Sequence, residues 1–599
     1  MTDIASLRPL AAVAVPALAI PAIYASRRRP NLREGWTMLA AGLAFALVAS
    51  MIPAALAGDA YVTDLGAFVP GVEFALRADA LGMLFGLLAS LLWVITSAYS
   101  IGYMRGLDEH AQTRYFASFA ASVSAAIGVA FASNILVLFV FYELLTVATY
   151  PLVTHDETAE ARAAGRKYLA YTFSGGVAVL AGTALVYWLT GTVTFTPGGI
   201  EGLAADPTVA RAAFALLAGG FGVKAALMPV HSWLPDAMVA PTPVSGLLHA
   251  VAVVKSGVFG IARVVLDVYG PATVSDLGVG LPLAAVAAFT LVAASVIALR
   301  QDNLKRRLAY STVSQLSYIV LGLAVLTPNA LIGGLLHIPA HAFMKLTLFF
   351  CAGVIHVETH TDDISDMAGI GKRMPLTMSA FAVAAAGMAG IPLVAGFVSK
   401  FYILIGTIDA GQLVLTAALL LSGVLNIAYF WPIVYQAFFE GEAADRHDRK
   451  PLIEHALGGR ADVAVDGGYD GHDRNARDVD APGTEPRAAE SARPVAEREG
   501  EYAVDRNPSD HARPDESTAE DGAAERGRGE DRDGHDVHHG PPADGWERRG
   551  WLGQESTWFM LGPILLAVAG SVVLGLVPYA AVFLRLVERI VAAATGVVA

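Results

Sequence analysis

Seven ionisable residues lie inside apolar stretches that are long enough to cross a lipid bilayer. They are Glu143, Lys224, Lys255, His337, His341, Lys345 and Lys400. An ionisable side chain at the centre of a bilayer costs about 2.5–3.5 kcal/mol by insertion scales, and such residues mark pathways for ions or protons. A purely structural membrane scaffold gives no reason to retain seven of them. The chain is therefore predicted to move ions or protons.

The composition is typical of a protein that crosses the membrane many times. Of the 599 residues, 55% are hydrophobic and only 16% are charged. With about 20 apolar residues per span, fourteen spans are predicted, at 7–25, 36–57, 79–103, 115–132, 134–153, 167–190, 212–234, 244–267, 277–299, 306–326, 330–355, 377–406, 412–438 and 556–583. The predicted fold class is an all-α polytopic protein of the cell membrane. The first span has no basic leader and no cleavage-site pattern, so we expect a retained helix rather than a signal peptide.

Basic residues alternate between the two sides of these spans. One side carries Arg27, Arg28, Arg29, Arg33, Arg105, Arg114, Arg162, Arg166, Lys167, Arg300, Lys305, Arg306, Arg307, Lys372 and Arg373. The other side has little beyond Arg77 and Arg211, with Arg263 near the end of the eighth span. By the positive-inside rule, the basic loops are predicted to be cytoplasmic and both termini to lie outside.

Residues 441–550 interrupt the pattern of spans. This segment has 28 acidic and 16 basic residues, a net charge of −12 in a chain whose total is −13. It cannot bury enough apolar surface to offset its ordering entropy, so we predict a disordered cytoplasmic insert. Its seven histidines, which include His535, His538 and His539, show no fixed ligand spacing. We therefore predict no metal site there.

Cysteine is nearly absent from the chain. The single residue, Cys351, lies inside the eleventh predicted span. One cysteine excludes an internal disulfide and a cysteine-ligated iron–sulfur centre. No cofactor is predicted, and electron transfer, if the system has any, is assigned to another polypeptide of the complex.

Two of the ionisable residues lie in the fifth and seventh predicted spans. Glu143 is the only acid in the fifth span, where the alternative to a transport role is neutralisation by the hydroxyl of Thr146 or Thr149. Lys224 follows a glycine-rich stretch of the seventh span and precedes Pro229. Proline lacks an amide hydrogen and crowds the carbonyl four residues earlier, so the helix is predicted to break just after the lysine. Broken helices beside ionisable groups are a recurring device of transporters.

The eighth and eleventh spans carry the densest group. Lys255 follows His249 in the eighth span. Lys224 lies in the preceding span, and two nearby lysines each raise the cost of ionising the other. In the eleventh span, His337, His341 and Lys345 recur every four residues. This spacing predicts one polar seam, roughly 12 Å long, along a helix face. Histidine titrates near neutral pH, so a proton relay is favoured over satisfied core histidines.

The twelfth span repeats the composition of the seventh. It combines glycines, Pro392 and a single lysine, Lys400. Gly/Pro-interrupted spans in corresponding positions of two halves are typical of transporters with internal repeats. The tenth span adds polar groups that could hold water between charged stations, namely Ser311, Thr312, Ser314, Gln315 and Ser317.

Three stretches resemble the proton-conducting antiporter-like subunits of Mrp-type antiporters, respiratory complex I and membrane-bound hydrogenases. They are KAALMPVHSWLPDAMVAPTPVSGLLHA at 224–250, DNLKRRLAYSTVSQLSY at 302–318 and HIPAHAFMKLTLFFCAG at 337–353. The resemblance covers residues 75–440 and implies about fourteen helices, with helices 4–8 and 9–13 as inverted repeats and helices 7 and 12 broken. It implies that pairing of Glu143 with Lys224 is the gate. Lys255, His337, His341 and Lys345 match the central hydrophilic axis, and Lys400 falls at the broken twelfth helix.

The resemblance also sets the expected domain organisation. N-terminal helices 1–3 occupy 1–110, the two half-channel repeats occupy 111–270 and 271–440, the insert occupies 441–550, and the last helix with a short tail occupies 551–599. The insert is not part of the family pattern. The largest complex I member also carries a long amphipathic helix after its core, and no such helix is expected here.

The expected function is that of a proton-translocating subunit of a multi-subunit Mrp-type Na⁺/H⁺ antiporter. Its expected partners are other hydrophobic subunits, the lipid bilayer, protons and Na⁺, and no nucleic acid. The alternative is a proton-pumping subunit of a complex I-like NADH:quinone oxidoreductase or membrane-bound hydrogenase. A third reading is an energising partner of a soluble zinc protein in inorganic carbon uptake. Because the chain carries no redox or hydrolytic site, its status as part of an enzyme is left open, and the proteins that accompany it distinguish these readings.

Overall fold

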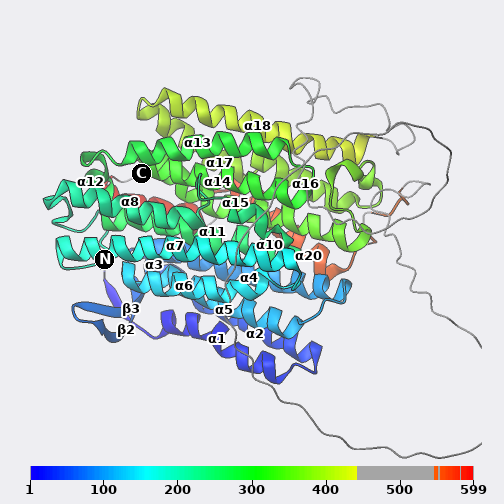
Figure 1. Cartoon of the computed structure of the whole chain (residues 1–599), viewed down its shortest axis with the longest axis horizontal. Coiled ribbons are helices and arrows are strands. Elements are labelled where there is room, and N and C mark those ends of the chain that lie inside the picture. Colours follow the sequence, from blue (N-terminus) through cyan, green and yellow to red (C-terminus); the bar gives the residue numbers. More distant parts are fainter. Residues whose placement is uncertain (1, 441–545, 551–553, 580–581, 598–599) are drawn as a thin grey trace, which may run out of the picture. The chain divides into compact units, whose positions relative to one another are not determined.

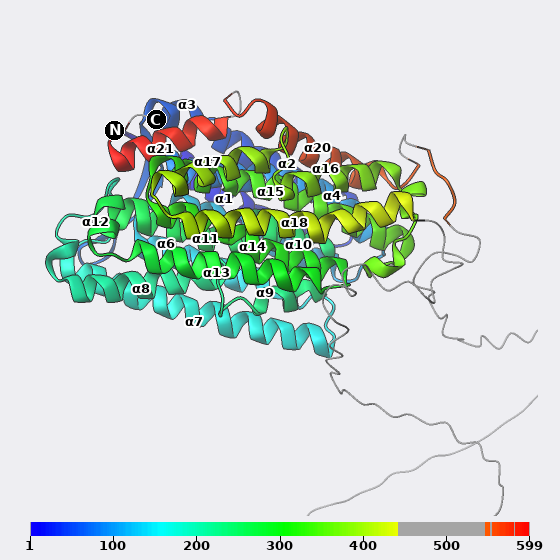
Figure 2. The same ribbon diagram turned by 90° about the horizontal axis from the view of Figure 1, so that it is seen from above.

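The computed structural model describes residues 2–440, 546–550, 554–579 and 582–597. Its long helices lie side by side along a common direction (Figures 1 and 2). The helices of the first half are α1 (Arg8–Ala25), α2 (Pro30–Ala49), α3 (Ile52–Ala57), α4 (Ala80–Gly106), α5 (Gln112–Phe131), α6 (Ile135–Val153), α7 (Ala159–Thr190), α8 (Pro207–Lys224), α9 (Trp233–Asp236), α10 (Thr242–Gly246), the π-helix η3 (Leu247–Val251), α11 (Val253–Arg263) and the π-helix η4 (Val264–Val268). Those of the second half are α12 (Gly270–Asp276), α13 (Gly280–Leu299), α14 (Leu304–Val325), α15 (Pro328–Thr359), α16 (Pro375–Ala389), α17 (Ala395–Asp409), α18 (Leu413–Phe439), α20 (Trp558–Leu576) and α21 (Val582–Thr595).

The described residues form 11 helices that are long and apolar enough to cross a membrane. Three of the predicted spans, at 212–234, 244–267 and 377–406, instead fall on shorter helices. The first is interrupted after α8, the second is divided among α10, η3, α11 and η4, and the third is divided between α16 and α17. A multi-pass, helical membrane fold is therefore confirmed. The count of fourteen spans stays a prediction, and nearly all of the insert at 441–550, with His535, His538 and His539, lies outside the described residues.

A small sheet near the N-terminus was not predicted from the sequence. It has the order β1 (Asp3–Ala5), β2 (Ala60–Val69), β3 (Val72–Ala78), with β1 parallel to β2 and β2 antiparallel to β3. Pro70 and Gly71 form the two-residue turn between β2 and β3, and Gly71 has a φ of 79°. A Pro-Gly pair between apolar runs indicates a turn, so the turn was readable from the sequence, although proline at the first position is not what two-residue hairpins favour.

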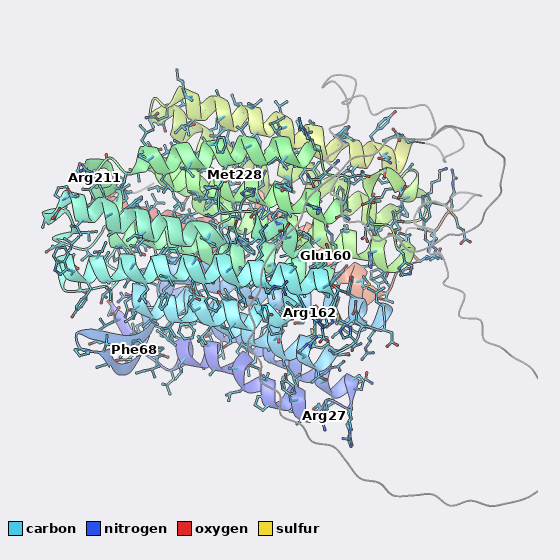
Figure 3. All side chains as sticks on the ribbon, viewed as in Figure 1. Arg27, Phe68, Glu160, Arg162, Arg211 and Met228 are labelled. Atoms are coloured by element: carbon cyan, nitrogen blue, oxygen red, sulfur yellow. The ribbon has the colours of Figure 1, made fainter. Side chains whose placement is uncertain are left out.

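The two ends of the helices carry the two sets of loops that the charge pattern separated. Figure 3 shows Arg27 and Arg162 at one end and Arg211 and Phe68 at the other. The sheet and the marked chain ends lie at the same end of the helices as Arg211 and Phe68 (Figures 1 and 3). The alternation of basic loops thus corresponds to two opposite ends of the described helices.

Helix α15 lies at the centre of the packing. It contacts α10, α14, α16, α17, α20 and α21, and every residue from Ala330 to Ile355 is buried. A helix that is apolar on all faces is buried on all faces, and the buried stretch 330–355 meets this condition apart from its three ionisable residues, His337, His341 and Lys345. These three polar residues are therefore held in the protein interior and not at the lipid surface.

Candidate functional site

Helix α8 ends at the predicted break. Its last residue is Lys224, and α9 begins at Trp233 after the turn that contains Pro229. Lys224 is fully buried. Its Nζ donates a hydrogen bond to the backbone carbonyl of Tyr142 and lies 3.3 Å from the centroid of the Tyr142 ring. The break therefore places the amine of Lys224 against α6, at Tyr142, which is the residue before Glu143.

Glu143 lies on α6 with its carboxylate against α7. An added Cβ at Gly176 would sit 2.1 Å from Glu143 Oε1, so only glycine leaves room for this carboxylate. Within the described part of the chain, neither carboxylate oxygen has a hydrogen-bond partner, and Glu143 does not bond to Lys224. The hydroxyls of Thr146 and Thr149 donate to backbone carbonyls of α6. The alternative in which one of these hydroxyls neutralises Glu143 is therefore wrong.

Lys255 and His341 form a direct contact. Lys255 lies on α11, and its Nζ is hydrogen-bonded to Nδ1 of His341 on α15, with both side chains fully buried. Two residues after the lysine, Gly257 packs on the end of α8, where an added Cβ would sit 2.7 Å from the carbonyl carbon of Lys224. The close approach brings α11 against the α8 break.

His337 links α15 to two other helices. Its Nδ1 lies 2.7 Å from Ser399 Oγ of α17, and its Nε2 lies 2.9 Å from Gln315 Oε1 of α14. Because an amide oxygen only accepts, Nε2 carries the ring proton and Nδ1 accepts from the Ser399 hydroxyl. The rings of His337 and His341 have centroids 6.1 Å apart.

Lys400 lies in the second turn of α17, close to the second break, which separates α16 from α17. Its Nζ donates to the carbonyl of Met388, near the end of α16, and lies 4.4 Å from the centroid of the Tyr318 ring. The same carbonyl accepts from Gln315 Nε2 at 3.4 Å and from Asn426 Nδ2 at 3.2 Å. Gln315 therefore joins His337 to the carbonyl that holds Lys400.

The structure does not bring all seven predicted residues into one line. Lys255, His341, His337 and Lys400 form one run across α11, α15, α14 and α17. Lys345 diverges from this run, because its Nζ donates to the Leu308 carbonyl at 2.7 Å and to Ser311 Oγ. Glu143 and Lys224 form a second group at the α8 break. His249 faces the Phe349 ring with a centroid separation of 4.8 Å, and neither of its nitrogens has a partner among the described residues.

Several residues that complete this site were not predicted from the sequence. Ser311 and Gln315 were identified only as groups that could hold water, whereas both bond directly to ionisable side chains. The contributions of Tyr142, Ser399 and the Met388 carbonyl were not predicted. Ser399 is the residue before Lys400, and a hydroxyl next to a predicted intramembrane lysine was a signal that could have been used. A backbone carbonyl has no sequence signal beyond its closeness to the break.

A buried ion cluster near the opposite end of α11 was also missed. Arg263 donates to Asp79 Oδ2 and Asp267 Oδ2, each at 2.7 Å, and to Asp79 Oδ1 at 2.8 Å. Asp79 caps the N-terminus of α4, where its Oδ1 accepts from the Gly82 amide at 2.7 Å. The cluster ties α4 to the α11–η4 segment. The spacing of four between Arg263 and Asp267 was a readable signal.

Comparison with known proteins identifies the family. The family described as "NADH:quinone oxidoreductase/Mrp antiporter, TM" matches residues 132–426, a range that includes all seven predicted site residues. The chain is 34% identical over 377 residues to the NADH-quinone oxidoreductase subunit N of Desulforudis audaxviator, covering 62% of this chain and 74% of that protein. The chain belongs to this family. A Na(+)/H(+) antiporter subunit of Alkalihalophilus pseudofirmus is 33% identical over 403 residues, covering 64% of this chain and 49% of that protein.

Two solved structures share the fold of this chain. The structure of the Mrp complex from Dietzia sp. DQ12-45-1b matches with a TM-score of 0.72 and 22% identity, covering 98% of this chain and 97% of that chain. The membrane-bound sulfane sulfur reductase, an archaeal respiratory membrane complex, matches with a TM-score of 0.66 and 26% identity, covering 76% of this chain and 92% of that chain. Both neighbours are parts of membrane complexes. The chain spans about half the length of the Alkalihalophilus antiporter protein and about three quarters of the Desulforudis protein.

Proposed function

We propose that this chain is the proton-translocating membrane subunit of a multi-subunit Mrp-type Na⁺/H⁺ antiporter. The observation that carries the proposal is the run of side chains from Lys255 through His341, His337 and Gln315 to the carbonyl that binds Lys400. Buried ionisable groups that are linked in this way can pass a proton between helices. The similarity to an Mrp complex and to a protein of a Na(+)/H(+) antiporter supports the choice of ion.

The tautomers of the two histidines support transfer toward Lys400. Lys255 Nζ donates to His341 Nδ1, so neutral His341 carries its proton on Nε2. Transfer of a proton from Lys255 to Nδ1 leaves the lysine neutral and frees the His341 Nε2 proton for onward movement. His337 can take up a proton at Nδ1 when the Ser399 hydroxyl turns to the carbonyl of Gly396, which lies 3.3 Å away. His341 Nε2 has no hydrogen-bond partner among the described residues, and the His337 and His341 ring centroids are 6.1 Å apart. Passage from His341 to His337 and on to Lys400 therefore requires bridging water or a larger side-chain movement.

The gate in this proposal is the pair Glu143 and Lys224. Lys224 now bonds the carbonyl of Tyr142, the residue before Glu143. A swing of the lysine side chain toward the carboxylate would form the pair and hold the lysine in its charged form, because an opposite charge nearby favours the ion. Return of Nζ to the carbonyl would release this stabilisation. Residues 111–270 and 271–440 would then act as the two half-channels.

A second candidate function is a proton-pumping subunit of a complex I-like oxidoreductase. The specific observation that favours it is the 34% identity to an NADH-quinone oxidoreductase subunit N. In that case, electron transfer in other subunits would drive the same residues. The basic loops, and with them the insert at 441–550, are proposed to face the cytoplasm under both functions.

The accompanying proteins test the proposal. We expect the tagged chain, purified from its native membrane in mild detergent, to co-purify with small hydrophobic antiporter subunits and with no redox protein. Mass spectrometry of the purified complex identifies these chains. Recovery of iron–sulfur, quinone-site or hydrogenase subunits would refute the antiporter assignment and establish the second function.

The Gln315 bridge provides a test inside the chain. Gln315→Leu removes the acceptor of the His337 proton and the donor to the Met388 carbonyl while it keeps a side chain of similar size. We expect proton transport by the assembled complex to fall about 10-fold or more, because two neutral hydrogen bonds of about 0.5–1.5 kcal/mol each are lost and about 1.4 kcal/mol corresponds to a tenfold change in rate. Quenching of a pH-sensitive dye in inverted membrane vesicles measures the rate.

The matched control for Gln315 is Ser317→Ala. Ser317 lies two residues further along α14 and bonds only to the Val313 carbonyl at 3.0 Å in the described part of the chain. We expect its rate to stay near that of the unmodified complex. Equal rates for Gln315→Leu and the unmodified complex would remove Gln315 from the relay.

A further inference from the structure

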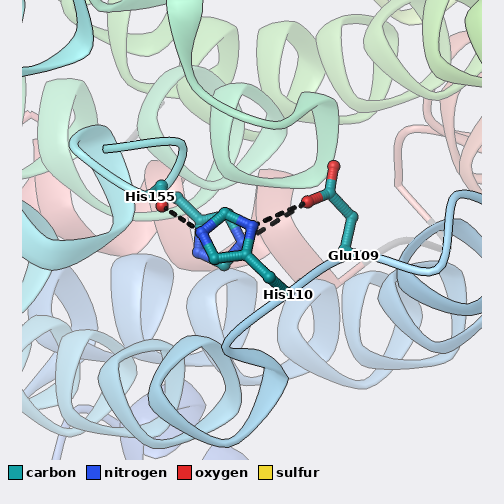
Figure 4. Close-up of side chains that lie close together, drawn as sticks. All are labelled: Glu109, His110 and His155. Carbon is teal, nitrogen blue, oxygen red and sulfur yellow. Dashed lines mark hydrogen bonds and ion pairs between the residues drawn. The ribbon is translucent and has the colours of Figure 1, made fainter. Parts of the chain in front are cut away.

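A group of metal-ligand side chains lies outside the relay, at the end of the helices that carries Arg162. Glu109 and His110 belong to the turn between α4 and α5, and His155 follows the end of α6. Figure 4 shows both imidazole rings beside the Glu109 carboxylate. One ligand atom of each residue lies within 4.8 Å of the others. The group therefore joins two turns that are 45 residues apart along the chain.

The distances are close to those of a metal site. Glu109 Oε2 lies 3.7 Å from His110 Nδ1 and 3.6 Å from His155 Nε2. Zinc binds nitrogen and oxygen ligands at about 2.0–2.2 Å in a tetrahedron, which places neighbouring ligand atoms about 3.3–3.5 Å apart. The two distances from the Glu109 carboxylate are within a few tenths of an ångström of that separation, whereas the two imidazole nitrogens, which lie within 4.8 Å of each other, would have to approach more closely.

The tautomer of His110 is set for ligation. Its Nε2 lies 3.0 Å from the backbone carbonyl of His155, which can only accept a hydrogen bond. The ring proton is therefore on Nε2, and the lone pair of Nδ1 is directed to the Glu109 carboxylate. Metal-binding histidines commonly donate their second N–H to a carbonyl in this way. Two acceptors that face each other are satisfied either by a proton on Nδ1, which makes an ion pair with Glu109, or by a bound cation.

His155 supplies the independent observation. Its side chain is fully buried, and neither ring nitrogen has a hydrogen-bond partner among the described residues. A buried polar atom without a partner is destabilising, and a bond from Nε2 to a metal ion would offset this cost. The side chains of His110 and Glu109 are 50% and 19% exposed. An ion can therefore enter from solvent, and water can take a fourth position.

We propose that Glu109, His110 and His155 bind a divalent transition-metal ion, for which Zn²⁺ is the best match to two imidazoles and one carboxylate. The bound ion would fasten the α4–α5 turn to the end of α6, the helix that carries Glu143. This site was not predicted from the sequence, because the three ligands share no local spacing motif. The charged and titratable groups around the site include Arg114, which donates to the His155 carbonyl at 3.1 Å, and its ion-pair partner Glu157. Asp156, Lys305 and His356 also lie close to the Glu109 carboxylate. The proposal does not depend on which membrane complex contains the chain.

Zinc binding to the purified full-length chain tests the proposal. The protein is prepared without a polyhistidine tag, stripped with chelator and titrated with Zn²⁺, and the bound metal is measured by elemental analysis. We expect His110→Ala and Glu109→Gln each to lose one zinc ion per chain at low free Zn²⁺. The expected loss of affinity is about 100-fold or more, because even residues that only orient metal ligands contribute about 10–100-fold. Co²⁺ substitution adds an absorption spectrum that reports tetrahedral coordination.

A control variant separates this site from the histidines of the insert. The triple variant His535→Ala, His538→Ala, His539→Ala removes candidate ligands there. It is expected to retain the zinc ion. Unchanged zinc content in His110→Ala, or loss of zinc only in the triple variant, would overturn the proposal. His155→Ala is expected to lose the ion as well. Because His110 is half exposed and His155 is buried, the His110 variant decides the outcome if His155→Ala does not fold.

Discussion

Proton transport is expected to fall to background in Lys224→Met, while the complex still assembles. The lysine ends α8, is fully buried and bonds the Tyr142 carbonyl beside Glu143. Methionine has a similar length and fits an apolar environment, so the packing of the α8 break is retained. What is lost is the amine that holds and releases a proton at this position. Lys224→Ala and Glu143→Gln are expected to give the same loss of transport.

Dye quenching in inverted vesicles measures this loss, and co-purification of partner proteins verifies assembly. The matched control is Lys167→Met, because Lys167 forms a partly exposed ion pair with Asp236 at 2.6 Å. An exposed pair contributes at most about 1 kcal/mol to stability, so transport should be retained. A normal pH gradient in either Lys224→Met or Glu143→Gln would remove this pair from the relay.

The main features of the fold could be predicted because they follow from local chemistry. Pro229 has no amide hydrogen, so the end of α8 at Lys224 was readable from the sequence. The same reasoning applies to the separation of α16 from α17 near Pro392. The hairpin of β2 and β3 was not predicted, although its Pro70–Gly71 pair indicates a turn. The number of spans depends on the membrane position of the interrupted helices, which local patterns do not determine.

The sequence predicted ionisable residues that the structure buries, but not the partners that they meet. A spacing of four places His337, His341 and Lys345 on one face of α15, and all three are buried there. Helical periodicity cannot say which neighbouring helix each side chain meets. Lys345 turns to the start of α14, whereas His341 turns to α11 and His337 to α14 and α17. These partners follow from tertiary packing, which no spacing in a single helix encodes.

Arg263 is another residue whose partners could not be predicted from the sequence. Its substitution is expected to have the largest effect on stability. The sequence identified it only as a charge near the end of a span, whereas the structure places it between Asp79 and Asp267 with its side chain only 2% exposed. Arg263→Met would leave two buried carboxylates without their shared cation. Removal of one partner from a buried ion pair costs about 3–5 kcal/mol. We therefore expect a marked drop in the midpoint of thermal unfolding of the purified chain.

The loss of stability in Arg263→Met is expected to be electrostatic in origin. A second substitution that removes one of the two carboxylates should therefore restore part of it. In Arg263→Met with Asp267→Leu, only Asp79 keeps its charge, and it remains stabilised by the Gly82 amide at the N-terminus of α4. We expect the double variant to unfold at a higher temperature than Arg263→Met. Arg211→Met is the matched control, since Arg211 donates to the Leu277 carbonyl at 2.9 Å and should change the midpoint far less. If Arg263→Met and Arg211→Met unfold at the same temperature, the cluster does not hold α4 to α11.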